Sequence, residues 1–132
     1  MPVVLVVEDD EQVRVLSESA LREAGHTVIA ATGVEGARAL LDSEQPIDVM
    51  FIDINLGNDI EGGLTVAQHA REKRLQLAIL YTTGLGINDG MKALFTEPFL
   101  FLPKPYTIEQ LTKSVAFLLL KVHPRPRPVL PL

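Results

Sequence analysis

Short apolar runs alternate with segments of helical periodicity along most of this chain. Residues 3–7 are five consecutive apolar residues, four of them valine, which is typical of a strand buried on both faces of a sheet. Similar short runs predict strands at residues 26–31, 47–54, 77–81 and 99–102. The hydrophobic pattern therefore predicts five short strands.

Helices are expected between these strands. Between Asp10 and Gly25, apolar residues recur at helical spacing, and the glycine is expected to end that helix. The same periodicity predicts helices at residues 34–43, 64–74 and 107–122, and a short one at 89–95. Thr107 precedes Gln110 by three residues, a spacing that resembles a capping box at the start of the last helix.

The repeated strand–helix order predicts an α/β fold, in which helices cover both faces of a five-stranded parallel sheet. We expect a single domain over residues 1–122, because a chain of 132 residues can bury one hydrophobic core. Residues 123–132 contain four of the nine prolines and are expected to form an extended arm. Since this arm ends in apolar residues, one hypothesis is that it packs on a second subunit to form a homodimer.

Composition narrows the possible functions. The net charge of -5 argues against nucleic acid as a partner, and the absence of cysteine excludes disulfides and zinc–thiolate sites. No apolar run approaches the roughly 20 residues of a membrane span, and the N-terminus does not resemble a signal peptide. The expectation is a cytoplasmic protein without a membrane partner.

Polar residues follow several of the predicted strands. Glu8 and Asp9 follow the first strand, Asp53 lies near the end of the third, Thr83 follows the fourth and Lys104 follows the fifth. In an open parallel sheet, ligands bind outside the carboxyl ends of the strands. Three acids, a hydroxyl and a lysine are therefore expected at one edge.

This set of side chains has a chemical logic. Carboxylates brought close together repel one another, and a magnesium ion (Mg²⁺), which prefers oxygen ligands, would remove that conflict. Asp53 could then attack phosphorus as a nucleophile. Mg²⁺, Lys104 and the Thr83 hydroxyl would stabilise the charge on the transferred group.

Most of these residues also have a plainer interpretation. Asp10, or Asp9 alone, could simply cap the first helix, and Lys104 could be a solvated loop residue. Thr82 is interpreted as a sheet or loop residue. The glycines after the fourth strand lack phosphate-loop spacing, and the three histidines, which lack ligand spacing, are expected at the surface. Phe95 and Phe99 could belong to the core or to a partner surface.

Four segments together resemble the receiver domain of two-component response regulators (CheY-like): residues 3–10, 51–56, 82–84 and 101–106. The resemblance covers residues 3–121. Asp53 and Thr83 are 30 positions apart, and Thr83 and Lys104 are 21 apart, both close to the family's usual separations. The resemblance implies a flavodoxin-like sheet of order 2-1-3-4-5, for which a CheY-type receiver is the usual example.

The resemblance also implies a role for each residue of the site. Asp53 would be the phosphoacceptor, and Thr83, Phe101 and Lys104 would be the switch and phosphoryl-contacting residues. Pro105 would follow a cis peptide bond. The implied Mg²⁺ ligands are Glu8 (through water), Asp9, Asp53 and the backbone carbonyl of Asn55.

The implied function is that of a single-domain response regulator. It would accept a phosphoryl group from a sensor histidine kinase or a phosphotransfer protein, and signal by protein contact or within a phosphorelay. Such a module is not an enzyme in the usual sense, although it promotes its own phosphorylation and dephosphorylation weakly.

Three features depart from the family pattern. Glu8 replaces the commoner aspartate, Phe101 lacks a hydroxyl, and the loop after Asp53 is about two residues longer than usual, with Gly57 where proline is common.

Two other functions compete with this one. A phosphatase of the haloacid-dehalogenase type would need an Asp-x-Asp motif, whereas Asn55 lies two positions after Asp53. A receiver that acts unphosphorylated as a scaffold stays open, and incubation with acetyl phosphate would separate the three functions.

Overall fold

The computed structural model describes residues 1–57 and 61–122. It contains one five-stranded parallel sheet, in the order β2-β1-β3-β4-β5 that the resemblance implies. The strands are β1 (Val3–Val7), β2 (Thr27–Ala31), β3 (Val49–Asp53), β4 (Ala78–Thr83) and β5 (Phe99–Pro103). The predicted arm at 123–132 lies outside the described residues, so its packing and the proposed homodimer stay predictions.

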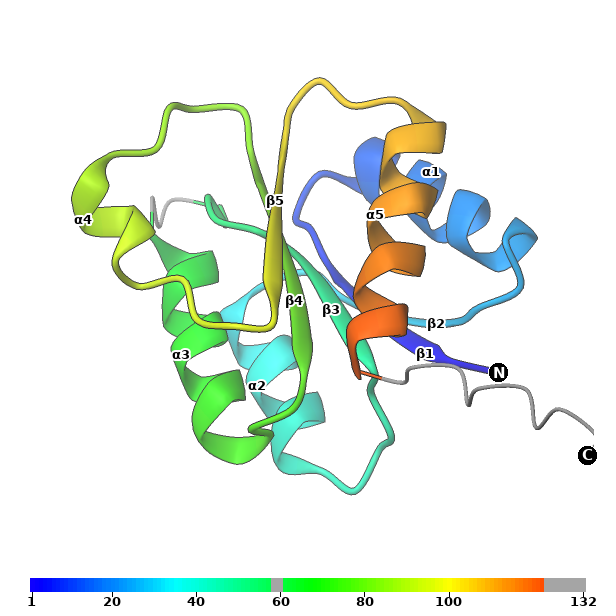
Figure 1. Cartoon of the computed structure of the whole chain (residues 1–132), viewed down its shortest axis with the longest axis horizontal. Helices are drawn as coiled ribbons and strands as arrows, with labels where there is room; N and C mark the ends of the chain where they lie inside the picture. Colours follow the sequence, from blue (N-terminus) through cyan, green and yellow to red (C-terminus); the bar gives the residue numbers. More distant parts are fainter. Residues whose placement is uncertain (58–60, 123–132) are drawn as a thin grey trace, which may run out of the picture.

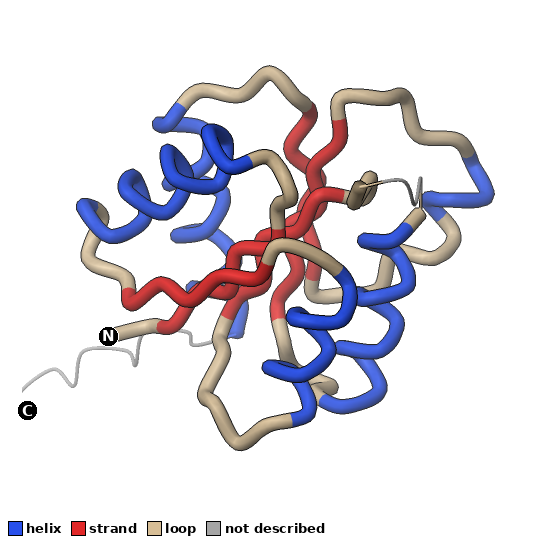
Figure 2. Tube along the Cα trace, turned by 180° about the vertical axis from the view of Figure 1, so that it is seen from behind, coloured by secondary structure: helices blue, strands red, loops and turns tan. Residues whose placement is uncertain are grey.

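Helices cover both faces of the sheet, as predicted. They are α1 (Glu11–Glu23), α2 (Val34–Asp42), α3 (Gly62–Lys73), α4 (Asp89–Lys92) and α5 (Ile108–Val122). In Figure 1, α1 and α5 lie on one side of the sheet and α2 and α3 on the other. Figure 2, which views the molecule from behind, shows the strands as the central layer. Two separate clusters of buried apolar residues, one on each face, hold the layers together.

Several predicted boundaries were wrong by a few residues. The fourth strand continues to Thr83, so both threonines belong to the strand, whereas the third is shorter than the predicted 47–54. The helix predicted at 89–95 is a single turn. In α1, Leu16 belongs to the apolar pattern but is 64% exposed, while Ser17 is buried. Periodicity identifies a helix more reliably than it identifies which residue faces the core.

Both predicted helix starts are confirmed. The Asp10 side chain caps α1 by accepting a hydrogen bond from the amide of Val13 at 3.1 Å. The Thr107 side chain accepts a hydrogen bond from the amide of Gln110 at 3.0 Å, and the Gln110 side chain accepts one from the amide of Thr107 at 2.9 Å. These contacts satisfy amides that the helices themselves leave unpaired.

Two of the histidines that were expected at the surface are partly buried instead. His69 on α3 lies 2.7 Å from Asp42 on α2, and burial lowers the pKa of His26. The open question about Phe95 and Phe99 resolves toward the core, because both pack against the buried Tyr81. Within the part of the chain that the structure describes, no helix is long and apolar enough to cross a membrane.

Candidate functional site

The predicted polar residues lie together at the carboxyl edge of the sheet. Parallel register brings the strand ends level, since Asp53 pairs with Thr82 and Thr83 pairs with Pro103. The turn after β1 adds Glu8 and Asp9. Segments far apart in the sequence therefore contribute to one site, as the strand order predicted.

Three carboxylates form the centre of this site. Glu8, Asp9 and Asp53 each offer one oxygen, and these oxygens lie within 4.8 Å of one another. Glu8 and Asp53 are buried, whereas Asp9 is exposed. Because all three ligand atoms would be carboxylate oxygens, the set fits a hard divalent cation such as Mg²⁺.

The ammonium group of Lys104 reaches into the same cluster. Its nitrogen Nζ lies 2.8 Å from Glu8 Oε1 and 2.8 Å from Asp53 Oδ2. Burial lowers the pKa of Lys104, but its hydrogen bonds to Asp53 and Glu8 outweigh this effect and raise it. The lysine therefore stays charged and neutralises part of the acidic cluster.

This arrangement disfavours the charged form of Glu8. Burial raises the pKa of Glu8 to about 7, the hydrogen bond from Lys104 opposes the rise, and the neighbouring charge of Asp53 adds to it. The Glu8 carboxyl group therefore loses its proton less readily, because the three acids share the single ammonium group of Lys104.

Both oxygens of Asp53 accept hydrogen bonds. Oδ1 accepts from the amide of Asn55 at 3.0 Å, and Oδ2 accepts from Lys104. Only 7% of the Asp53 side chain is exposed. This carboxylate is therefore fixed in orientation and largely covered, which the sequence did not indicate.

Thr83 also points into the site. Its hydroxyl donates a short hydrogen bond to Asn55 Oδ1 and accepts one from the amide of Leu85 at 3.1 Å. Only the backbone carbonyl of Asn55 was expected to contribute to the site, so this side-chain contact was not predicted. Thr82, interpreted as a sheet or loop residue, lies buried in β4, and its hydroxyl lacks a hydrogen-bond partner among residues 1–57 and 61–122.

Comparison with known proteins decides the family. The sequence profile of the response regulator receiver domain matches residues 4–116. The chain belongs to this family. Receiver domains are signalling modules of two-component systems and are generally not classed as enzymes.

Curated relatives of this receiver domain are longer proteins. The chain is 29% identical over 120 residues to the sensor kinase CckA of Brucella abortus, covering 89% of the chain and 12% of the kinase. It is 32% identical over 113 residues to the transcriptional regulatory protein YrkP of Bacillus subtilis, covering 85% of the chain and 47% of that protein. The receiver domain therefore spans less than half the length of these two relatives.

Solved structures share both the fold and the length of this receiver domain. A response regulator receiver protein from Sinorhizobium medicae has a TM-score of 0.84 and 28% identity, with 92% of this chain and 97% of that chain covered. The response regulator TrrA from Thermotoga maritima, solved in complex with Mg²⁺ and BeF, has a TM-score of 0.77 and 25% identity. The match covers 89% of this chain and 99% of the TrrA chain.

The departure at Gly57 has a structural counterpart in this receiver domain. Gly57 has a φ of +58°, in the left-handed region that favours glycine, and its amide donates to Asp9 Oδ2 at 3.0 Å. Proline, which is common here in the family, has no amide hydrogen to donate. This loop therefore holds Asp9 by a contact that proline could not make.

Gly63 is a site-shaping residue that sequence reasoning missed. Its amide donates to the carbonyl of Ile54 at 2.8 Å, and a Cβ added to it would lie 2.1 Å from the carbonyl oxygen of Asp53. The first turn of α3 thus rests directly on the backbone that carries Asp53. The only signal in the sequence was the glycine pair at the start of the predicted helix.

Phe101 lies outside the acidic cluster, in an aromatic group. Its ring stacks on Phe95 at a centroid distance of 6.3 Å, and Phe95 stacks on Tyr81 at 4.2 Å. Phe101 is partly buried against the core, and because its ring has no hydroxyl to form a hydrogen bond, only packing holds it in place. The Lys104–Pro105 peptide bond is cis, as the resemblance implies.

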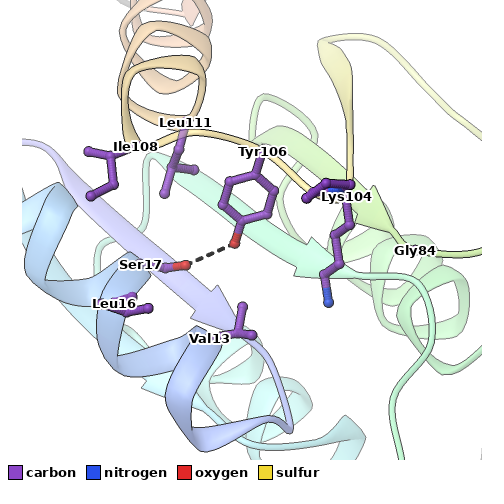
Figure 3. Close-up of a pocket in the computed structure, with 9 residues that line it drawn as sticks. Val13, Leu16, Ser17, Gly84, Lys104, Tyr106, Ile108 and Leu111 are labelled. Atoms are coloured by element: carbon purple, nitrogen blue, oxygen red, sulfur yellow. Dashed lines mark hydrogen bonds between the residues drawn. The ribbon is translucent and has the colours of Figure 1, made fainter.

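An apolar cavity of about 460 Å³ lies beside Lys104, between α1 and the start of α5. Figure 3 shows Tyr106 in this cavity with its hydroxyl directed at Ser17 on α1. The Ser17 Oγ and Tyr106 oxygens are 3.0 Å apart, and burial raises the pKa of Tyr106. This pair was not predicted from the sequence, although Ser17 falls among apolar positions of α1.

Proposed function

We propose that this receiver domain accepts a phosphoryl group on Asp53 from a sensor histidine kinase or a phosphotransfer protein. The observation that carries the proposal is the position of Asp53 between the Lys104 ammonium, 2.8 Å away, and the carboxylates of Glu8 and Asp9. A nucleophilic carboxylate, a cation for the transferred group and an oxygen-rich metal site are the parts that phosphoryl transfer requires.

The residues that would hold Mg²⁺ are Asp9, Asp53, the backbone carbonyl of Asn55, and Glu8 through a water. The ion would neutralise charge on the carboxylates and on the phosphoryl oxygens. The cluster of three carboxylate oxygens supports this proposal, as does the Mg²⁺ bound to the similar receiver TrrA.

The transfer to Asp53 would form one bond to phosphorus and break another. A carboxylate oxygen of Asp53 attacks the phosphorus of a phosphohistidine, the new P–O bond forms, and the P–N bond breaks. The electron pair of that bond returns to the imidazole nitrogen of the donor. Lys104 would exchange its contact with Asp53 for one with a phosphoryl oxygen, because the ammonium already lies beside the attacking group.

The response would begin at Thr83. To reach the phosphoryl oxygen, the Thr83 hydroxyl would release Asn55 Oδ1, its present acceptor. Movement of Thr83 would change the packing of Phe101 on the neighbouring strand, and with it the surface of α4, β5 and α5. Such a response is a shift between two populated arrangements of one fold.

Incubation with acetyl phosphate and Mg²⁺, followed by intact mass measurement, tests this proposal. We expect one phosphoryl adduct on the parent protein and none on Asp53→Asn. Asp10→Asn is the matched control, because asparagine also caps helices and Asp10 lies outside the proposed site. Removal of acetyl phosphate would then measure how slowly the adduct is lost. If the parent protein forms no adduct, the proposal is wrong, and a receiver that acts unphosphorylated as a scaffold is favoured instead.

We further infer that the receiver acts in the cytoplasm, where histidine kinases obtain ATP. Fractionation of the source cells followed by an immunoblot tests the inference. The protein is expected in the cytosolic fraction, and a product confined to the membrane fraction would contradict it.

A further inference from the structure

A buried hydroxyl pair links helix α1 to the loop that carries Lys104. Ser17 is 3% exposed, and its Oγ lies 3.0 Å from the hydroxyl of Tyr106, two residues after the lysine. Figure 3 shows the two groups facing each other beside apolar side chains from α1 and α5. Because buried polar atoms in such surroundings need partners, each hydroxyl satisfies the other.

The loop between β5 and α5 is therefore held from two sides. On the sheet side, the amide of Lys104 donates to the carbonyl of Thr83 at 3.1 Å. On the helix side, Tyr106 bonds to Ser17, and its ring packs edge-on against Phe51 with centroids 5.6 Å apart. The lysine makes the first attachment itself and lies two residues before the second.

We propose that Ser17 and Tyr106 are a positioning pair that holds the Lys104 ammonium between Asp53 and Glu8. This inference rests on the proposed function wherever it concerns phosphoryl transfer. Its structural part, the placement of the ammonium, can be measured without phosphorylation.

The reason is geometric. Lys104 Nζ makes two hydrogen bonds of 2.8 Å at once, and such bonds weaken steeply with small changes in distance and angle. A displacement of the loop by a fraction of an ångström would lengthen at least one of them. Loss of either hydroxyl removes the only polar attachment between α1 and this loop that is seen within residues 1–57 and 61–122.

Two variants test the pair, because each removes one oxygen atom and little else. Tyr106→Phe and Ser17→Ala should each slow adduct formation from acetyl phosphate by about three- to tenfold. The double variant should be no slower than the slower single variant, since the two hydroxyls act as one unit. Ser19→Ala, an exposed position on the same helix, should match the parent.

A second comparison separates positioning from a general loss of stability. In a Lys104→Ala background, Tyr106→Phe should have no further effect on the rate, because the group that it positions is absent. If Tyr106→Phe slows both backgrounds equally, the pair is structural and the proposal is wrong.

The ammonium signal of Lys104 in ¹⁵N-edited NMR provides a readout without acetyl phosphate. We expect Tyr106→Phe to shift this signal and to speed its exchange with water, while Ser19→Ala leaves it unchanged. An unchanged signal in Tyr106→Phe would overturn the proposal. A parent protein that forms no adduct would contradict the proposed function alone, because the ammonium signal would still decide the positioning role.

Discussion

Lys104 Nζ lies 2.8 Å from Asp53 Oδ2, so a cation from the loop after β5 covers the carboxylate that ends β3. The same nitrogen contacts Glu8, and only 24% of the lysine side chain is exposed. In this arrangement the ammonium neutralises part of the charge that a divalent cation would also neutralise. The lysine and the proposed Mg²⁺ would therefore act on the same two acids.

Lys104→Ala should destabilise the metal-free protein, because it leaves the two buried carboxylates without their ammonium partner. We expect a loss of roughly 1–3 kcal/mol in the free energy of unfolding in EDTA, since the partly exposed lysine limits the effect. Mg²⁺ should recover more stability in this variant than in the parent. Urea unfolding with EDTA and with Mg²⁺ measures both. Lys113→Ala, which removes the lysine of an exposed pair with Glu109, is the control. If Mg²⁺ stabilises Lys104→Ala no more than it stabilises the parent, the prediction is wrong.

Glu8 should make the stability of the metal-free protein depend on pH. Its pKa is about 7 in the folded state and close to the ordinary 4.5 when unfolded, so between these values the folded state binds more protons. Unfolding free energy should therefore fall as pH rises from about 4.5 to 7. Relative to the parent, Glu8→Gln should gain roughly 1–3 kcal/mol between pH 5 and pH 8 in EDTA. Thermal or urea unfolding at several pH values measures this difference, and a constant difference would rule out the raised pKa.

Gly63→Ala should destabilise the fold, although alanine normally favours a helix by about 1 kcal/mol over glycine. The added Cβ would lie 2.1 Å from a backbone oxygen, which cannot move without displacing Asp53. A net loss of roughly 1–3 kcal/mol is expected from urea unfolding, together with slower adduct formation. Gly86→Ala is the matched control, because an added Cβ there meets nothing within 4 Å. Similar stabilities for the two variants would show that α3 can retreat from β3.

Arg71→Lys should loosen the segment between α4 and β5. The guanidinium of Arg71 on α3 donates hydrogen bonds to the hydroxyl and the carbonyl of Thr96. It also donates to the carbonyls of Leu75, Leu77 and Pro98. An ammonium has only three donors and cannot reproduce this planar fork. We expect faster hydrogen exchange at the amides of residues 94–97 and a loss of roughly 1–3 kcal/mol in unfolding free energy. Arg22→Lys, an exposed change, should show neither effect, and unchanged exchange in Arg71→Lys would contradict the prediction.

The amino-acid sequence was enough to predict the architecture and the edge of the sheet at which the site lies. Alternating apolar runs and helical periodicity are local properties, so the five strands, the five helices and the cap at Asp10 could be predicted. Consecutive βα units make the sheet parallel, and the residues after its strands must then meet at one edge. Asp53 and Lys104 could be brought together by this argument although they are 51 positions apart.

The contacts between individual atoms at that edge could be seen only in the three-dimensional structure. The two contacts of Lys104, the Thr83 bond to the Asn55 side chain, the covering of Asp53, and the Ser17–Tyr106 pair all join residues distant in sequence or depend on rotamers. Periodicity specifies which face of an element is buried, but not which polar atom of another element lies opposite. The close approach at Gly63 is hidden for the same reason, because the space above a glycine is set by how helix and strand pack.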